Sequence, residues 1–122
     1  MRTRSRLLLE RALDRALRDP NPVARLRSER DEADDEEVAR ALAAVDPEGF
    51  RVAARLVAKL RFARIAAGST VAGRLFREEP RRFVRLFVAF HAAFRPTTFP
   101  ADEGRRFERF LRSRGVERSG RG

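Results

Sequence analysis

The sequence predicts an all-α protein, a compact bundle of about six or seven helices with a long central helix near residues 47–67. Two observations carry this prediction. Apolar residues recur at steps of three and four residues through most of the chain, which is the period of an amphipathic helix. No stretch of useful length alternates between apolar and polar residues, as a half-buried strand would. Proline and glycine then divide the helical pattern into separate segments.

Ahead of the central helix, the chain is expected to form three shorter helices. They cover about residues 4–18, 23–27 and 35–45. In the first of them, Leu9, Leu13 and Leu17 share one face, and the two prolines that follow end the helix because each disfavours the α conformation in the residue before it. Residues 28–35 carry most of a dense acidic run. Like charges at this density oppose compact packing, so this stretch is predicted to be a mobile loop.

The central helix is expected to begin at Asp46-Pro47, a residue pair typical of an N-cap and first helical position. Its core-facing side is predicted to consist of Val52, Leu56, Leu60, Ala63 and Ala67. Further apolar residues, Phe50, Ala53 and Val57, widen that side. Such a broad apolar surface is typical of a helix that is contacted by several neighbours.

The rest of the chain is expected to form three more helices. A short one follows an N-cap in the sequence Gly68-Ser69-Thr70, an aromatic one opens at Pro80, and the last, over about 100–113, is capped by Thr98. The aromatic helix carries a stripe whose members follow one another at steps of four, three and four residues: Phe83, Phe87, Phe90 and Phe94. In the last helix, Phe107, Phe110 and Leu111 are expected to return to the core.

With 122 residues, the chain is expected to form one helical domain over residues 1–113, followed by a disordered basic tail over 114–122. The basic N-terminus lacks the apolar run of a signal peptide, and no stretch has the roughly twenty apolar residues that span a bilayer. Cysteine is absent, which excludes disulfides. We therefore expect a cytoplasmic protein that does not engage membranes.

The net charge of +10 points to an acidic partner. Three basic residues on the central helix, Arg51, Arg55 and Lys59, repeat every four positions and form a ridge of like charge. A second group, Arg81, Arg82 and Arg85, lies at the start of the aromatic helix, where the helix dipole disfavours cations. His91 is the only histidine, and we expect it to be structural or to face a partner. These seven residues are the predicted partner-binding residues.

Catalysis, metal binding and cofactor binding find no support in the residue pattern. A lone histidine and the lack of cysteine leave no catalytic pair and no cluster of metal ligands. The acidic run lacks the glycine and the final glutamate that a calcium-binding EF-hand loop requires. The segment GSTVAGRL has the glycine spacing of a P-loop but replaces its lysine by Arg74 and follows a helix. We therefore expect a protein that is not an enzyme.

The segment RLFREEPRRFVRLFVAFHAAFRPTTFPADEGRRFERFL, Arg74 to Leu111, resembles part of a known helical domain. That domain, named for DNA binding, occurs in the partner proteins of multinuclear iron-dependent oxidative enzymes, and the likeness extends over about Leu56–Leu111. The matching positions are Glu78, Glu79, Phe83, Phe90, His91, Pro96, Phe107, Phe110 and Leu111. The N-terminal half instead looks like the short helical modules that are common in gene clusters for peptide modification.

The resemblance implies an accessory protein that docks on an iron-dependent oxidative enzyme and helps to present a ribosomally made precursor peptide for modification. Two alternatives come from other classes. The chain could be a helical protein that binds nucleic acid without sequence preference, through phosphate contacts of the basic ridge. It could also be a structural or regulatory interaction protein.

Overall fold

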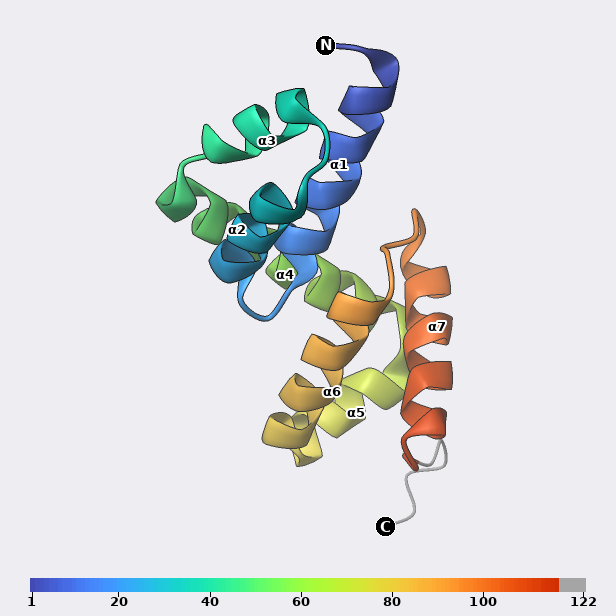
Figure 1. The fold of residues 1–122 in the computed structure, drawn as a ribbon. Coiled ribbons are helices and arrows are strands. Elements are labelled where there is room, and N and C mark those ends of the chain that lie inside the picture. The colour runs from blue at the N-terminus through green and yellow to red at the C-terminus, as the bar shows by residue number, and fades with distance from the viewer. Residues whose placement is uncertain (117–122) are drawn as a thin grey trace. The chain divides into compact units, whose positions relative to one another are not determined.

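The computed structural model describes residues 1–116, and in this range every regular element is an α-helix. The elements in order are α1 (Thr3–Arg18), α2 (Pro22–Glu32), α3 (Glu36–Ala43), α4 (Pro47–Gly68), α5 (Thr70–Glu78), α6 (Pro80–Ala93) and α7 (Pro100–Ser113). The all-α prediction is confirmed, and α4 is the longest helix (Figure 1). The chain divides into two compact units, of which the second begins at Lys59.

Side-chain caps and prolines account for most of the helix starts. Asp35 caps α3 by accepting hydrogen bonds from two backbone amides, and the Asp46 carboxylate accepts one from Gly49 N, 2.8 Å away, at the start of α4. Ser69 caps α5, as expected. The cap predicted at Thr98 is wrong, because Phe99 is the residue that precedes α7 and no side chain caps this helix. Proline occupies the first position of α2, α4, α6 and α7.

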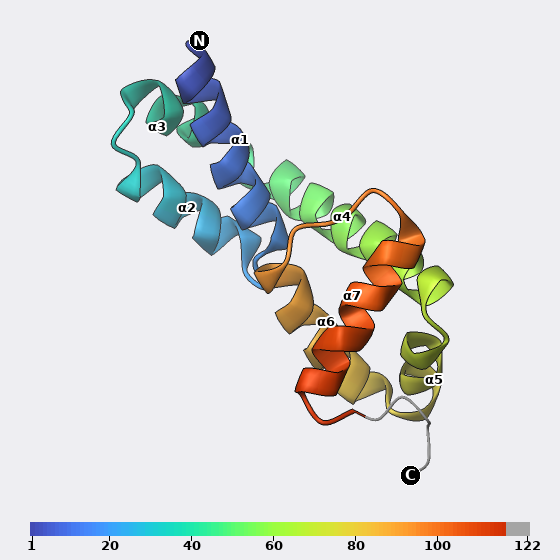
Figure 2. The same cartoon turned by 90° about the vertical axis from the view of Figure 1, so that its right-hand side faces the viewer.

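The first unit is organised around α1, which contacts both α2 and α3 (Figures 1 and 2). Its core consists of Ala12, Ala16, Leu26, Val38, Leu42 and Phe50. Phe50 comes from the first turn of α4, so the start of that helix belongs to this unit.

The acidic loop expected at 28–35 is mostly helix, because α2 continues to Glu32 and only residues 33–35 connect it to α3. Two cations compensate part of the negative charge in this stretch. Glu29 accepts hydrogen bonds from Arg15 on α1 and from Arg25 one turn earlier on α2. The Arg25 pair, four residues apart, supports the helix, and the Arg15 pair ties α2 to α1. Of the tail predicted over 114–122, residues 117–122 lie outside the described part of the chain.

The second unit contains α5, α6 and α7, each in contact with the other two. Figure 2 shows α6 and α7 next to each other. Phe83, Phe87 and Phe90 are buried as expected, and the predicted contributions of α7, Phe107, Phe110 and Leu111, are buried too. Phe94 does not follow them fully into the core, because the helix ends one residue earlier and Phe94 has an extended backbone.

The predicted core face of α4 is wrong. Its members Val52, Leu56, Leu60, Ala63 and Ala67 are all exposed to solvent. The residues of α4 that are buried instead are Phe50, Ala54, Arg61 and Ile65. Apolar residues lie on more than one side of this helix, so the local pattern alone did not decide which side would be covered.

Candidate functional site

Basic residues form a ridge on α4. Arg51, Arg55 and Lys59 all belong to this helix and recur every four residues, so they follow one side of it. Arg51 is partly neutralised by an ion pair with Glu48, one turn earlier. Arg55 and Lys59 are exposed and form no ion pair with any residue of the described range. The ridge predicted from the sequence is therefore available to an anionic group.

An apolar row runs beside this ridge. Val52, Leu56 and Leu60 each follow one of the basic residues in the chain, which places them about 100° further around the helix. They are 61%, 57% and 57% exposed. Scattered single apolar residues are common on protein surfaces, whereas contiguous exposed apolar residues rimmed by charged ones are typical of contact surfaces. We call these six residues the α4 face: Arg51, Val52, Arg55, Leu56, Lys59 and Leu60.

A shorter version of the same pattern occurs on α6. Arg81 and Arg85 are exposed, and so are Val84 and Val88, which lie on the same side at helical spacing. Arg82 is less accessible and forms an ion pair with Glu79 at 3.4 Å. Two of the three arginines predicted at this helix start are therefore free of carboxylate partners within the described residues.

His91 lies in the interior of the second unit, away from the exposed side of α6. It is only 5% exposed, and its ring stacks on Phe87 with the centroids 5.5 Å apart and the planes 10° from parallel. Its Nδ1 lies 3.2 Å from a guanidinium nitrogen of Arg61. The structure thus places the seventh predicted residue in a buried polar network and not beside the six arginine and lysine residues.

Arg61 is the centre of that network, and no motif or spacing in the sequence singles it out. Its guanidinium donates two hydrogen bonds to the Glu103 carboxylate, from Nε at 2.9 Å and from Nη2 at 3.2 Å. Nη1 donates to the Phe94 carbonyl oxygen at 2.5 Å, and the guanidinium stands 4.7 Å from the centroid of Phe90. Both charged side chains are almost fully buried. A signal exists for Glu103 only, because it lies at helical spacing from Phe107, Phe110 and Leu111 on the apolar side of α7.

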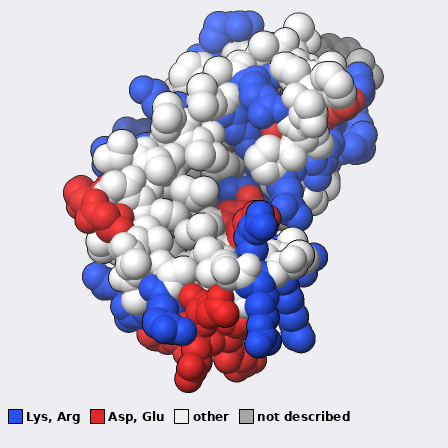
Figure 3. Space-filling model, turned by 90° about the horizontal axis from the view of Figure 1, so that it is seen from above, with Lys and Arg blue, Asp and Glu red and all other residues white. Residues whose placement is uncertain are grey.

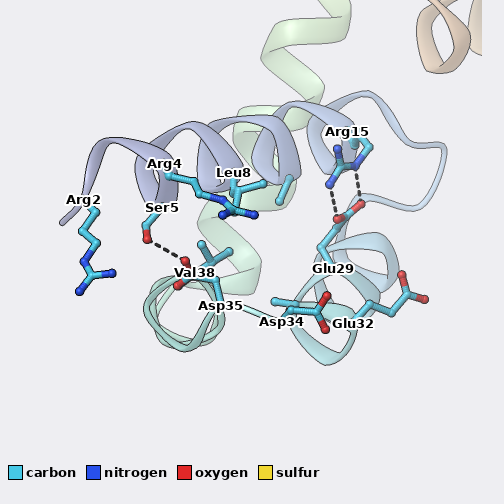
Figure 4. A pocket seen from close by; sticks show the side chains of 12 residues that line it. Arg2, Arg4, Ser5, Leu8, Arg15, Glu29, Glu32, Asp34, Asp35 and Val38 are labelled. Atoms are coloured by element: carbon cyan, nitrogen blue, oxygen red, sulfur yellow. Dashed lines mark hydrogen bonds and ion pairs between the residues drawn. The ribbon is translucent and has the colours of Figure 1, made fainter.

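A groove of about 590 Å³ lies between α1, α2 and α3 of the first unit (Figure 4). Arg2 and Arg4 line it from the N-terminal end of α1, and Glu32 and Asp34 line it near the end of α2. Its floor is apolar and includes Leu8. Charges of both signs therefore face one space. On the face of the molecule in Figure 3, acidic groups likewise gather in clusters with basic groups beside them.

Two carboxylates of this groove are held in the charged form. Hydrogen bonds from Arg15 lower the pKa of Glu29 to about 2, and Arg25 acts in the same direction. The Ser5 hydroxyl donates a 2.7 Å hydrogen bond to Asp35, and together with the backbone amide of Val38 it lowers the pKa of that carboxyl. The carboxylates of the groove wall are thus structural anchors that tie α1 to α2 and α3.

The pKa of Glu29 predicts how the stability of the first unit depends on pH. Because folding lowers this pKa from 4.5 to about 2, the stabilisation is complete above pH 4.5 and is lost as the pH falls toward 2. With partly exposed arginine partners, we expect Glu29→Gln to lower the free energy of unfolding by about 2 kcal/mol at pH 6. Urea unfolding of both proteins at several pH values would show this difference shrinking below pH 4.5. A difference that stayed constant down to pH 2.5 would contradict the assignment.

The residues of the described range hold no group of three or more histidine and acidic side chains that could bind a metal ion. None of the helices in this range is long and apolar enough to cross a membrane. Comparisons of the chain with protein-family models, with curated proteins and with solved structures found no match.

Proposed function

We propose that this protein is a non-catalytic binding partner that holds an acidic, amphipathic segment of another polypeptide on the α4 face. The observation that carries the proposal is the exposed apolar row beside the basic ridge on one helix. Apolar groups at spacings of four residues provide the anchors of a helix-binding surface, and the cations beside them select acidic residues and orient the segment.

The apolar row favours a polypeptide over a nucleic acid. A phosphate backbone would use Arg51, Arg55 and Lys59 but would leave Val52, Leu56 and Leu60 in water. A helix packed on the row would remove those three side chains from water, and burying each is worth about 1.5–3 kcal/mol before the entropy of association is subtracted. Nucleic-acid binding remains the second candidate because the ridge could bind phosphates. In that case the affinity for nucleic acid would fall steeply with salt concentration.

The partner that we propose is an iron-dependent oxidative enzyme together with the precursor peptide that it modifies. Support for this identity comes from the resemblance over Arg74–Leu111. Most of the matching aromatic positions, such as Phe83, Phe90 and Phe107, are interior residues of the second unit. These matching positions support a likeness in the architecture of the second unit, whereas the α4 face would supply the contact with the partner. A structural or regulatory interaction protein would use the same surface with another partner.

The double substitution Val52→Glu and Leu56→Glu tests the α4 face. We expect affinity for an iron-dependent oxidative enzyme that binds this protein, or for its precursor peptide, to fall at least 30-fold, roughly the effect of losing 2 kcal/mol of apolar contact. Arg55→Glu with Lys59→Glu should weaken binding mainly at low salt. Calorimetric titration of the purified proteins measures both effects.

The control is Leu7→Glu, which introduces a single glutamate at an exposed leucine of α1. It should bind as the unaltered protein does. Two results would overturn the proposal: no interaction of the unaltered protein with the enzyme or the peptide, or unchanged affinity of the Val52→Glu, Leu56→Glu protein. Binding to duplex DNA that weakens steeply with salt, and that requires Arg51, Arg55 and Lys59, would establish the nucleic-acid alternative.

A further inference from the structure

The second unit contains a small pocket between α6 and α7 that belongs to neither the α4 face nor the buried ion pair. Its volume is about 250 Å³. The residues that line it are Phe90, Phe94, Arg106, Arg109, Phe110 and Ser113. Ligand pockets for drug-sized molecules are usually of about 300–1,000 Å³, so this one suits a group the size of a single amino-acid residue.

Three phenylalanine rings form the apolar wall of the pocket. Phe90 lies 5.1 Å from Phe94 and 5.4 Å from Phe110, and Phe94 lies 6.0 Å from Phe110, measured between ring centroids. Phe90 and Phe110 are buried, but Phe94 is 38% exposed. Since α6 ends before Phe94, this ring stands at the edge of the core with part of its surface open to water.

Two guanidinium groups complete the pocket, and none of its lining residues is acidic. Arg106 donates a 2.9 Å hydrogen bond to the Arg95 carbonyl oxygen, and its guanidinium lies 5.7 Å from the centroid of Phe94. These contacts hold it in place and leave other N–H groups to donate. Arg109 is exposed, and its guanidinium forms no hydrogen bond or ion pair with residues 1–116. An anion seated against the rings would therefore meet fixed and free donors together.

We propose that this pocket binds the C-terminal residue of a polypeptide whose last side chain is apolar. The side chain would pack against Phe90, Phe94 and Phe110, and the terminal carboxylate would accept hydrogen bonds from Arg106 and Arg109. The apolar side chain and the carboxylate must both fit this small pocket. A C-terminal residue carries the two groups on one Cα. An internal acidic residue beside an apolar one divides them between two Cα atoms about 3.8 Å apart, whose side chains point to opposite sides of an extended chain.

The test uses a fluorescently labelled pentapeptide that ends in leucine with a free carboxylate. Two further probes differ by one feature each: the same peptide with an amidated C-terminus, and a free-carboxylate peptide that ends in glycine. In fluorescence anisotropy with the full-length protein, the amidated peptide and the glycine peptide should each bind at least tenfold more weakly than the leucine peptide with a free carboxylate. The amidated peptide lacks the hydrogen-bonded charge, and the glycine peptide lacks the buried leucine side chain.

Arg109→Gln should lower affinity for the free-carboxylate leucine peptide at least tenfold and leave the amidated peptide unaffected. Its matched control is Arg105→Gln, an exposed arginine of the same helix that is bound to Asp102 and does not line the pocket. This control should bind all three peptides as the unaltered protein does. Phe94→Ala should weaken both leucine peptides, with circular dichroism used to verify that the variant is folded.

Three results would overturn this proposal. They are equal affinity for the free and amidated peptides, equal losses for Arg109→Gln and Arg105→Gln, and no binding of the leucine peptide at millimolar concentration. The test does not depend on the α4 face, because the Val52→Glu, Leu56→Glu protein should bind the leucine peptide normally. Failure of one proposal thus leaves the other standing.

Discussion

Replacing Glu103 by leucine is expected to lower the free energy of unfolding by about 3–5 kcal/mol. The substitution removes the carboxylate that accepts two hydrogen bonds from Arg61 and leaves the guanidinium charged in an interior with almost no access to water. The Phe94 carbonyl oxygen, which also accepts a hydrogen bond from Arg61, is a neutral group and does not replace the lost negative charge. The loss should appear in urea unfolding followed by far-ultraviolet circular dichroism.

Two comparisons separate this effect from a general sensitivity of α7. Arg105→Gln breaks an exposed ion pair with Asp102 and should change stability by less than about 1 kcal/mol. The double variant Arg61→Met, Glu103→Leu removes both charges and should recover at least half of the loss, because well-packed apolar residues can replace a buried ion pair. A single Glu103→Leu variant that loses less than 1 kcal/mol would show that water or rearrangement relieves the Arg61 charge.

The helix order of this chain could be predicted because its signals are local. Proline begins four of the seven helices of the described range, and the caps at Asp46 and Ser69 lie immediately before the helices that they start. The Phe83, Phe87 and Phe90 spacing likewise identified a buried face within one helix. Each of these signals is read from residues only a few positions apart.

The errors concern interactions between residues that are distant in sequence. Arg61 and Glu103 are 42 residues apart, and nothing local indicates that each side chain would find the other. The charges of residues 28–35 alone predict a loop, whereas Arg15, 14 residues from Glu29 in the sequence, binds that carboxylate and ties α2 to α1. Sequence patterning predicts which segments are helical better than it predicts which charges are neutralised by tertiary contacts.

Only part of the α4 face could be predicted, because helical spacing is local whereas exposure depends on the rest of the fold. The spacing of Arg51, Arg55 and Lys59 correctly gave a ridge on one helix. The same spacing in Val52, Leu56 and Leu60 predicts burial, since an apolar row is usually a core face, but the structure leaves these residues exposed. Periodicity shows that residues share a side of a helix, but not whether the chain itself or a partner covers that side. The α6–α7 pocket needs two helices and could not be read from either alone.

Gly104→Ala is expected to destabilise the protein by about 3 kcal/mol, although alanine is the better helix former by about 1 kcal/mol. Gly104 lies in α7 against the end of α4, and a Cβ there would overlap the backbone carbonyl of Gly68. A Cβ on Gly68 would in turn overlap the carbonyl of Pro100. Backbone atoms cannot rotate away as a side chain can, so the two helix segments would have to separate.

Gly73→Ala, in the same unit, is expected to have the opposite effect on stability. Gly73 lies inside α5, and a Cβ at this position would meet only the end of the Arg77 side chain, at 3.5 Å. This substitution should stabilise the protein by about 0.5–1 kcal/mol through helix propensity and a less flexible unfolded chain. Thermal unfolding of the two variants under the same conditions should therefore move in opposite directions. If Gly104→Ala were stabilising as well, the close approach of α7 to the end of α4 would be refuted, and with it the geometry that brings Glu103 to Arg61.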